Sequence, residues 1–157
     1  MSISVIIAAG GKGSRMNLNV CKQLLDINNY PIIHYSISVF ESIDDVTNIL
    51  LVVNEKIIDE IKNIIDHYKY KKIIGIIKGG KERQDSVFTG LKFYEKKPPD
   101  IILIHDAVRP FINKTLVKSV INATKIYDAA IPALKIKDTI KHTDNGNFII
   151  TTPDRDK

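Results

Sequence analysis

Glycines and cations are concentrated in residues 8–16, which read AAGGKGSRM and follow the first apolar segment of the chain. Three glycines let a backbone turn tightly and direct several N–H groups toward one anion, and Lys12 and Arg15 add positive charge. The run is not a Walker A loop, which needs Gly-Lys-Ser/Thr after a four-residue gap, nor G-x-G-x-x-G, because Met16 replaces the third glycine. It predicts a phosphate-binding turn, with a purely structural turn between strand and helix as the alternative.

A second polar segment, residues 79–87 (GGKERQDSV), follows a later apolar strand and enters a helix. Its glycines allow close approach of a ligand, and the free N–H groups of the helix start, with polar side chains beside them, could read the edge of a base. An N-capping turn would use the same residues. Lys22, in a Lys-Gln pair that follows the first segment, could reach back to the phosphates or be an ordinary surface cation.

A third segment, residues 105–110 (HDAVRP), stands at the end of another expected strand. An acid at such a point, here Asp106, commonly lies near a metal or a substrate hydroxyl, and Arg109 could hold a second phosphate. His105 permits a catalytic interpretation, but its apolar strand neighbours favour a hydrogen-bonded core histidine.

The four arginines of the chain, in contrast to its 19 lysines, all fall within these segments or near the C-terminus, at Arg15, Arg83, Arg109 and Arg155. A planar, permanently charged guanidinium suits phosphate, whereas the lysines are mostly mixed with acids on helical stretches. This distribution predicts small phosphorylated ligands rather than nucleic acid. It also predicts catalysis by positioning and charge neutralisation rather than by a covalent nucleophile.

The elements that must position these residues alternate between strand and helix. Short, nearly continuous apolar runs indicate strands buried on both faces, and apolar residues at a spacing of three to four indicate amphipathic helices. The expected strands span 2–9, 48–53, 72–77, 101–105 and 128–133, and the expected helices follow Pro31 and cover the stretches 57–68, 84–95 and 114–127. The pattern predicts an α/β fold with a three-layer, mostly parallel, doubly wound sheet whose ligand lies beyond the carboxyl ends of its strands.

The C-terminal part departs from this alternation. Two runs of β-type composition flank Asn145-Gly146, and Asn-Gly in that position is a strong hairpin signal. We therefore expect a projecting β-hairpin arm, residues 134–157, within a single domain that covers 1–157. The charged segments of the arm, 137–141 (KDTIK) and 153–155 (PDR), read most simply as solvent-facing.

With 157 residues, of which 44% are hydrophobic and 26% charged, the chain has the size and composition of one folded domain. No apolar run approaches the ~18 residues that a membrane helix needs, and the N-terminal residues lack the basic region of a signal peptide. Cys21 is the only cysteine, so no internal disulfide can form. We expect a cytoplasmic protein without membrane or nucleic-acid partners, despite a formal net charge of +5.

Taken in order and spacing, these motifs resemble those of the 2-C-methyl-D-erythritol 4-phosphate cytidylyltransferase family over nearly the whole chain. The motifs are AGGKGSRM at 9–16, KQ at 22–23, GGKERQDSV at 79–87, HDAVRP at 105–110, KDTIK at 137–141 and DR at 154–155. The resemblance implies a nucleotide-diphospho-sugar transferase-like, Rossmann-like fold. It also implies an enzyme of nonmevalonate isoprenoid synthesis that joins CTP to methylerythritol phosphate and releases pyrophosphate, with Mg²⁺ bound to the triphosphate.

The resemblance further implies roles for individual residues. Catalytic roles fall on Arg15, Lys22 and Arg155. Nucleotide-binding roles fall on Ala9, Gly10, Gly11, Lys12, Gly13, Gly80, Lys81, Arg83 and Ser86. Binding of the polyol phosphate falls on Asp106, Arg109, Thr139 and Arg155. The arm would reach across a homodimer, so Thr139 and Arg155 would serve the neighbouring subunit, and Asp106 is a possible metal ligand, although the resemblance leaves the metal's protein ligand open.

Three features depart from the family pattern. Ala9-Gly10-Gly11 looks more like the ribitol-5-phosphate cytidylyltransferases and the sugar nucleotidyltransferases, and Cys21 replaces a proline. The family continues well past the arm, through a Thr-Pro-Gln segment and a later active-site lysine, so we expect a C-terminally truncated chain with an incomplete sheet and doubtful activity. A ribitol-5-phosphate cytidylyltransferase and a non-catalytic CTP-binding fragment remain as alternative functions.

Overall fold

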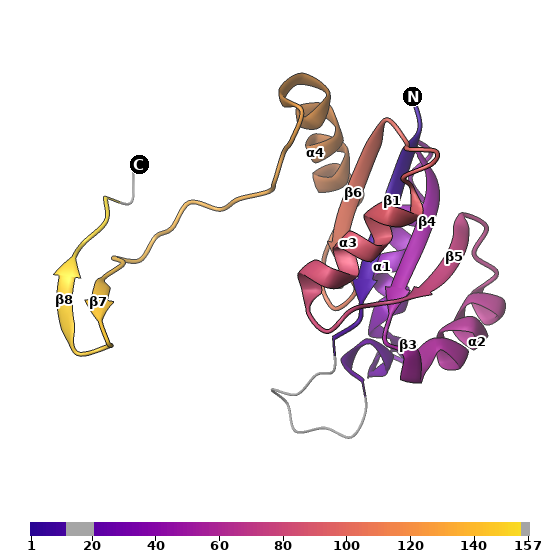
Figure 1. The fold of residues 1–157 in the computed structure, drawn as a ribbon, viewed down its shortest axis with the longest axis horizontal. Helices are drawn as coiled ribbons and strands as arrows, with labels where there is room; N and C mark the ends of the chain where they lie inside the picture. The colour runs from indigo at the N-terminus through magenta and orange to yellow at the C-terminus, as the bar shows by residue number, and fades with distance from the viewer. Residues whose placement is uncertain (12–20, 155–157) are drawn as a thin grey trace.

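The computed structural model describes residues 1–11 and 21–154, and its body is built on a sheet of four parallel strands in the order β5-β4-β1-β6 (Figure 1). These strands are β1 (Ile3–Ala9), β4 (Val46–Val53), β5 (Ile73–Lys78) and β6 (Ile101–Asp106). The central strands β1 and β4 are almost wholly buried, as their continuous apolar runs predict. The predicted parallel sheet is thereby confirmed.

Helices cover both faces of the sheet, which makes the body three-layered. Side chains of α1 (Ile32–Glu41), α2 (Ile58–Tyr68) and α4 (Lys114–Tyr127) pack into one core with one face of the strands. On the other face, Tyr94, which directly follows α3 (Arg83–Phe93), packs with Ile6, Leu50 and Val52 in a smaller core. Figure 1 shows α3 crossing in front of the strands and α1 behind them.

The helices form where the apolar spacing predicts them. In α1 the buried positions include Ile33, Ile37 and Phe40, a spacing of three to four that places them on one side of the helix. In α3, Gly90 brings the helix close to β1, because a Cβ at this position would lie 2.9 Å from Cγ2 of Ile6. The layer spacing on this face therefore depends on the absence of one side chain.

Short elements connect the main ones and were not predicted from the sequence. The first element described after β1 is η2 (Lys22–Leu24), which is followed by a small hairpin of β2 (Asp26–Ile27) and β3 (Tyr30–Pro31), and η3 (Glu55–Ile57) precedes α2. The hairpin turns at Asn28 and Asn29, whose φ angles are 50° and 65°. Asparagine tolerates this left-handed backbone better than most residues, so the Asn-Asn pair was the available sequence signal.

The strand expected at 128–133 does not form, and this prediction was wrong. Asp128 has a φ of 63°, so the chain turns sharply at the end of α4, and among the described residues no strand pairs with this segment. Pro132 lacks an N–H for a ladder, and the side chain of Ile131 is exposed. The apolar run AAIP therefore leads away from the body instead of extending the sheet.

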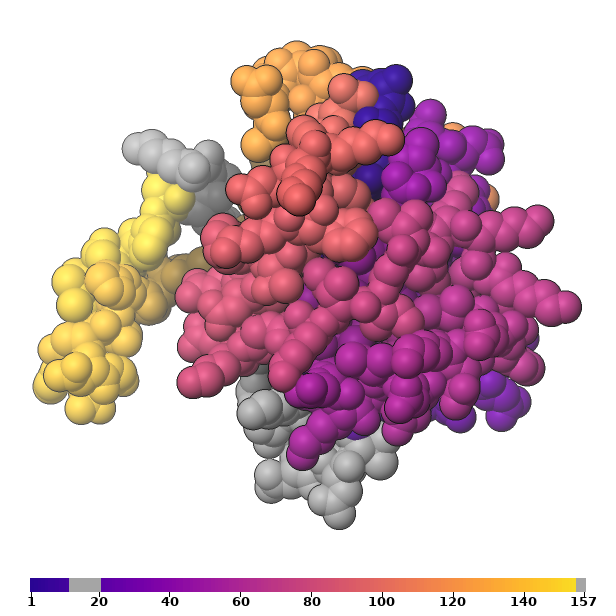
Figure 2. Space-filling model, turned by 45° about the vertical axis from the view of Figure 1, so that its right-hand side comes forward, coloured from indigo at the N-terminus to yellow at the C-terminus, as the bar shows by residue number. Residues whose placement is uncertain are grey.

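The predicted arm is present as a hairpin of β7 (His142–Asp144) and β8 (Phe148–Thr151), shorter than the sequence indicated. Asn145 and Gly146 form its turn with positive φ angles of 30° and 88°, as the Asn-Gly signal predicts. The arm stands clear of the body in the ribbon and in the space-filling view (Figures 1 and 2). None of the helices that the structure describes has both the length and the apolar content that crossing a membrane requires.

Candidate functional site

A cavity of about 590 Å³ opens at the carboxyl end of the sheet. β1 pairs with β4 on one side and with β6 on the other, so the chain reverses its winding direction between β1 and β6. In open parallel sheets ligands bind at such a point. The cavity is lined by Ala8, Ala9, Gly10, Gly11, Lys22, Gln23, Lys81, Glu82, Arg83, Ser86, Asp106, Val108 and Arg109. Segments far apart in the sequence therefore meet where the fold predicts a ligand.

The first wall of the cavity is the segment Ala8–Gly11 at the end of β1, and Gln23 holds this segment in place. The side-chain amide of Gln23 donates hydrogen bonds to the carbonyl oxygens of Ala9 and Gly11, the latter at 3.2 Å. Gln23 is only 2% exposed and its bond to Ala9 is buried, whereas its bond to the exposed Gly11 is partly open to water. Lys22, which precedes Gln23 in the sequence, also lines the cavity.

The second wall is the loop between β5 and α3. The Ser86 hydroxyl accepts a hydrogen bond from the Gly80 N–H and donates one to the Glu82 carbonyl, both at 3.1 Å. A Cβ on Gly10 would lie 2.8 Å from this hydroxyl, and one on Gly80 would collide with Asp85. The glycines of this loop, Gly79 and Gly80, are closely approached by Ser86 and Asp85 at the start of α3. That they also admit a ligand stays a prediction.

The third wall is the end of β6, where one carboxylate joins two guanidinium groups. Oδ1 of Asp106 accepts a hydrogen bond from Nε of Arg83 at 2.7 Å, and Oδ2 accepts one from Nε of Arg109 at 2.9 Å. Burial on its own would raise the pKa of Asp106, but the hydrogen bonds and charges of the two arginines outweigh it and hold this pKa below its usual range. The carboxylate is therefore ionised at neutral pH.

His105 holds the turn that follows β6. Its Nε2 donates to the carbonyl oxygen of Arg109 at 3.2 Å, and its ring meets that of Phe40 edge to face. Burial lowers the pKa of His105, which keeps the imidazole neutral. The Ser36 hydroxyl of α1 donates to the carbonyl of Ala107 in the same turn at 3.0 Å. The interpretation of His105 as a hydrogen-bonded core histidine is confirmed.

The charge on the cavity wall favours anions. Among the described residues that line it, the cationic side chains are those of Lys22, Lys81, Arg83 and Arg109, and the acidic ones are those of Glu82 and Asp106. The N-terminal turn of α3 adds the positive end of a helix dipole, and a capping box of Glu82 and Asp85 already satisfies part of its backbone N–H groups. A ligand that carries several phosphate charges would be stabilised here, and two anions could be held together.

Most of the predicted site residues that the structure describes lie on this cavity. They are Ala9, Gly10, Gly11, Lys22, Lys81, Arg83, Ser86, Asp106 and Arg109. Gly80 stands directly behind it, bonded to Ser86. Thr139 lies on the extended segment that leads to β7, apart from the cavity of its own chain. Lys12, Gly13, Arg15 and Arg155 lie outside the described residues.

The wall offers few ligands for a divalent cation. No group of three or more His, Cys, Asp or Glu side chains that could hold a metal is found within residues 1–11 and 21–154. Asp106, the possible ligand, already accepts bonds from two guanidinium groups. A magnesium ion bound here would therefore take most of its oxygen ligands from phosphate groups and water, with Glu82 or Asp106 as the protein carboxylates within the cavity.

Four residues of the wall were within predicted motifs but were not assigned to the site: Ala8, Gln23, Glu82 and Val108. Gln23 is the most informative of them, because an amide beside a lysine gives no sign in the sequence that it will be buried. The only available signal was that the Lys-Gln pair follows the glycine-rich turn closely enough to fold back on it.

A parallel α/β sheet with a glycine-rich sequence after its first strand and a cationic cavity at its switch point defines a nucleotidyltransferase-like fold. Residues 3–157 match the family model of 2-C-methyl-D-erythritol 4-phosphate cytidylyltransferase. The chain belongs to this family.

Curated relatives and solved structures agree with the family model. A 2-C-methyl-D-erythritol 4-phosphate cytidylyltransferase of Clostridium botulinum is 44% identical over 153 residues, which cover 98% of this chain and 66% of the relative. One of Caldanaerobacter subterraneus is 36% identical over 156 residues, covering 99% of this chain and 68% of the relative. The crystal structure of 4-diphosphocytidyl-2C-methyl-D-erythritol synthase from Anaerococcus prevotii has a TM-score of 0.84 at 32% identity, covering 99% of this chain and 64% of that one. The chain thus spans about two thirds of the length of these proteins.

Proposed function

We propose that this chain binds CTP and 2-C-methyl-D-erythritol 4-phosphate and transfers CMP from the first to the second, releasing pyrophosphate, in nonmevalonate isoprenoid precursor synthesis. The observation that carries the proposal is the meeting of three segments in one cationic cavity: the turn after β1, the loop before α3 and the Asp106–Arg109 turn. Such a cavity suits a reaction between two phosphorylated molecules, whose mutual repulsion must be offset.

In the proposed reaction a phosphate oxygen of methylerythritol phosphate attacks the α-phosphorus of CTP. A new P–O bond forms while the bond from the α-phosphorus to the oxygen that bridges the β-phosphorus breaks, and pyrophosphate leaves with that electron pair. Lys22, on the wall beside the β1 turn, offsets the charge that develops at the α-phosphate. Arg15 is proposed to act with it. Mg²⁺, when bound to the triphosphate, supplies further neutralisation of the same charge.

Different walls of the cavity are proposed to bind the two substrates. The loop of Gly80, Lys81 and Ser86 is proposed to hold the cytidine, since Lys81 and Ser86 line the cavity and the Gly80 N–H fixes the Ser86 hydroxyl there. Asp106 and Arg109 are proposed to hold the polyol phosphate, the carboxylate toward a hydroxyl group and the guanidinium toward the phosphate.

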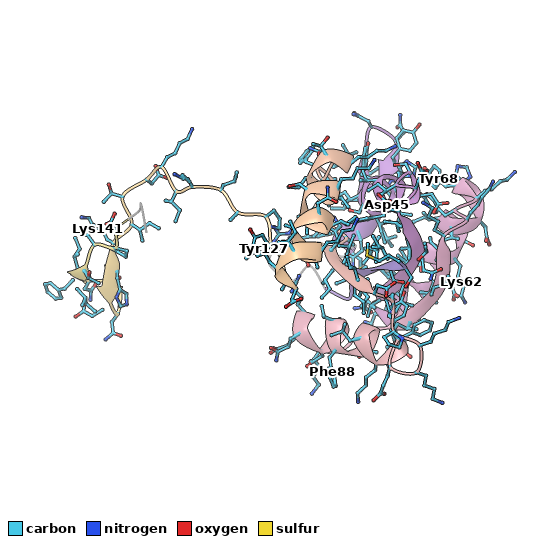
Figure 3. All side chains as sticks on the ribbon, turned by 90° about the horizontal axis from the view of Figure 1, so that it is seen from above. Asp45, Lys62, Tyr68, Phe88, Tyr127 and Lys141 are labelled. Atoms are coloured by element: carbon cyan, nitrogen blue, oxygen red, sulfur yellow. The ribbon has the colours of Figure 1, made fainter. Side chains whose placement is uncertain are left out.

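The arm is proposed to pair with a second copy of the chain. Its described part carries apolar side chains that the body leaves uncovered, including Phe148, which is 73% exposed, and Ile149 and Ile150. Exposed apolar surface of this kind marks a protein contact. In such a homodimer Thr139 and Arg155 would reach the neighbouring subunit's cavity, and Figure 3 shows the arm at Lys141 standing well apart from the body at Tyr127.

We also place the protein in the cytoplasm. Cys21 is the only cysteine of the chain, so its fold needs no disulfide and no oxidising compartment.

Pyrophosphate release from CTP tests the proposed function. The chain is assayed with Mg²⁺ and either methylerythritol phosphate or ribitol 5-phosphate, with ATP replacing CTP as a control for the base. We expect release with CTP and methylerythritol phosphate only. Release with ribitol 5-phosphate alone would assign the chain to the ribitol-5-phosphate enzymes, which the Ala9-Gly10-Gly11 sequence resembles. CTP binding without release from either acceptor would favour a non-catalytic CTP-binding function.

A further inference from the structure

Asp106 ties together two walls of the cavity that the proposed function gives to different substrates. Arg83 belongs to the first turn of α3, on the nucleotide side, and Arg109 to the turn after β6, on the polyol side. Each donates Nε–H to a different oxygen of the same carboxylate, at 2.7 Å and 2.9 Å. The side chain of Asp106 is 19% exposed, whereas those of Arg83 and Arg109 are 62% and 75% exposed.

The geometry of these contacts leaves both guanidinium groups able to bind a ligand. A guanidinium has five N–H groups, of which one is on Nε and four are on the terminal nitrogens. Within residues 1–11 and 21–154 both arginines bond Asp106 through Nε, so the terminal nitrogens can serve a ligand. The three side chains together carry a net charge of +1, so the cluster attracts an anion even though its carboxylate is ionised.

The position of Arg83 also bears on where the Asp106 carboxylate points. A carboxylate can rotate about its Cβ–Cγ bond, but hydrogen bonds from two sides hold its plane in one orientation. Arg83 supplies one of these two bonds from a helix, an element more rigid than a loop. Without the Arg83 side chain, Oδ1 of Asp106 would lose this donor. Arg109 alone would then hold the carboxylate, whose plane could rotate.

We propose that Arg83, although it lies on the nucleotide side of the cavity, is a positioning residue for the polyol phosphate and acts through Asp106. This inference rests on the proposed function, and it departs from the family resemblance, which groups Arg83 with the nucleotide. It makes Arg83 the link by which the loop that holds cytidine also orients the residues that hold the second substrate.

Calorimetric binding of two ligands tests the proposal on the chain as it exists. Affinities for methylerythritol phosphate and for CTP with Mg²⁺ are measured for the wild type, Arg83→Gln, Arg83→Lys and the control Lys62→Gln. Lys62 also pairs with a carboxylate at 2.9 Å on a helix, but on α2, away from the cavity. Lys62→Gln therefore removes one cation and one ion pair, as Arg83→Gln does, but at a distance from the cavity.

We expect Arg83→Gln to weaken binding of methylerythritol phosphate about tenfold, the effect of losing a hydrogen bond to a charged group, and to change CTP affinity less than about threefold. Arg83→Lys should restore part of the loss, because an ammonium can still pair with Asp106, and Lys62→Gln should change neither affinity. In an Asp106→Asn background, Arg83→Gln should have no further effect on the polyol phosphate, as expected for residues that act as a pair.

Three results would overturn the proposal. Arg83→Gln could weaken CTP as much as the polyol phosphate, which would return Arg83 to the nucleotide. Its effect could persist undiminished in the Asp106→Asn background, which would exclude action through Asp106. If the wild type itself bound no methylerythritol phosphate, the proposed function would fail together with this inference, whereas the first two results would leave the proposed function intact.

Discussion

Replacing Gln23 tests whether a buried amide holds the turn after β1 in place. Its two N–H groups bond the carbonyls of Ala9 and Gly11, and its side chain is nearly inaccessible to water. Leucine has a similar size but no donor, so Gln23→Leu leaves two carbonyls without this partner. Losing the bond to the buried Ala9 carbonyl leaves an unsatisfied acceptor and costs about 1–3 kcal/mol, and losing the bond to the exposed Gly11 costs about 1 kcal/mol. We expect Gln23→Leu to lower the free energy of unfolding by about 2–4 kcal/mol.

Gln23→Glu turns the same contact into a pH-dependent one. A protonated carboxyl can still donate one bond to these carbonyls, whereas a carboxylate would face two oxygen atoms in a buried site. The pKa of this carboxyl is therefore raised in the folded state above the ordinary value of about 4.3 in the unfolded chain. The protonated carboxyl contributes fully to the free energy of unfolding below the unfolded-state pKa. This contribution is lost as pH rises through the folded-state pKa, at up to about 1.4 kcal/mol per pH unit.

Urea unfolding at about pH 5 and pH 8 measures this effect, with the change in stability taken from the midpoint and slope. Gln84→Glu is the matched control, since it makes the same chemical change at an exposed position in the first turn of α3, where an added charge should alter stability by less than about 0.5 kcal/mol. Equal stability of Gln23→Glu and wild type at both pH values would refute the role given to Gln23.

Three other changes test separate parts of the structure. Lys22→Ala should lower turnover in the pyrophosphate assay by roughly 10², as removal of one transition-state donor does; near-normal turnover would exclude it from the site. Gly90→Ala should lower the free energy of unfolding by about 1–2 kcal/mol in urea, because overpacking against Ile6 exceeds the gain in helix propensity, and a more stable variant would contradict this packing. Phe148→Asp should yield a monomer by sedimentation, whereas the control Phe88→Asp, at an exposed phenylalanine of α3, should leave a dimer; a dimeric Phe148→Asp would remove the arm from the interface.

The sheet and the place of the site could be predicted because both follow from local patterns. Strands buried on two faces read as unbroken apolar runs, and polar segments after β1, β5 and β6 must meet at one edge once those strands are parallel. The Asn145-Gly146 turn was predictable for a similar reason, since its backbone angles are set by two residues.

The parts that could not be predicted depend on contacts between distant segments. The burial of Gln23 requires the carbonyls at the end of β1 to lie across from η2, and the direction of Arg83 is set by Asp106, 23 positions later. Residues 128–133 have the composition of a strand, but a strand also needs a neighbour to pair with, and the turn at Asp128 leads the chain elsewhere. In each case a contact with a distant segment decides the structure, and for residues 128–133 the lack of such a contact outweighs the local strand propensity.

The most direct test of the central claim is to map CTP on the chain by amide chemical shifts. In the presence of Mg²⁺, CTP should perturb the amides of Ala8–Gly11, Lys22 and Gln23, and Gly79–Ser86, which line or support the cavity after β1 and β5. ATP should perturb them less, because the loop before α3 is proposed to read the base. The absence of shifts at millimolar CTP, or shifts confined to α2 and the arm, would contradict a nucleotide site at the carboxyl end of this sheet.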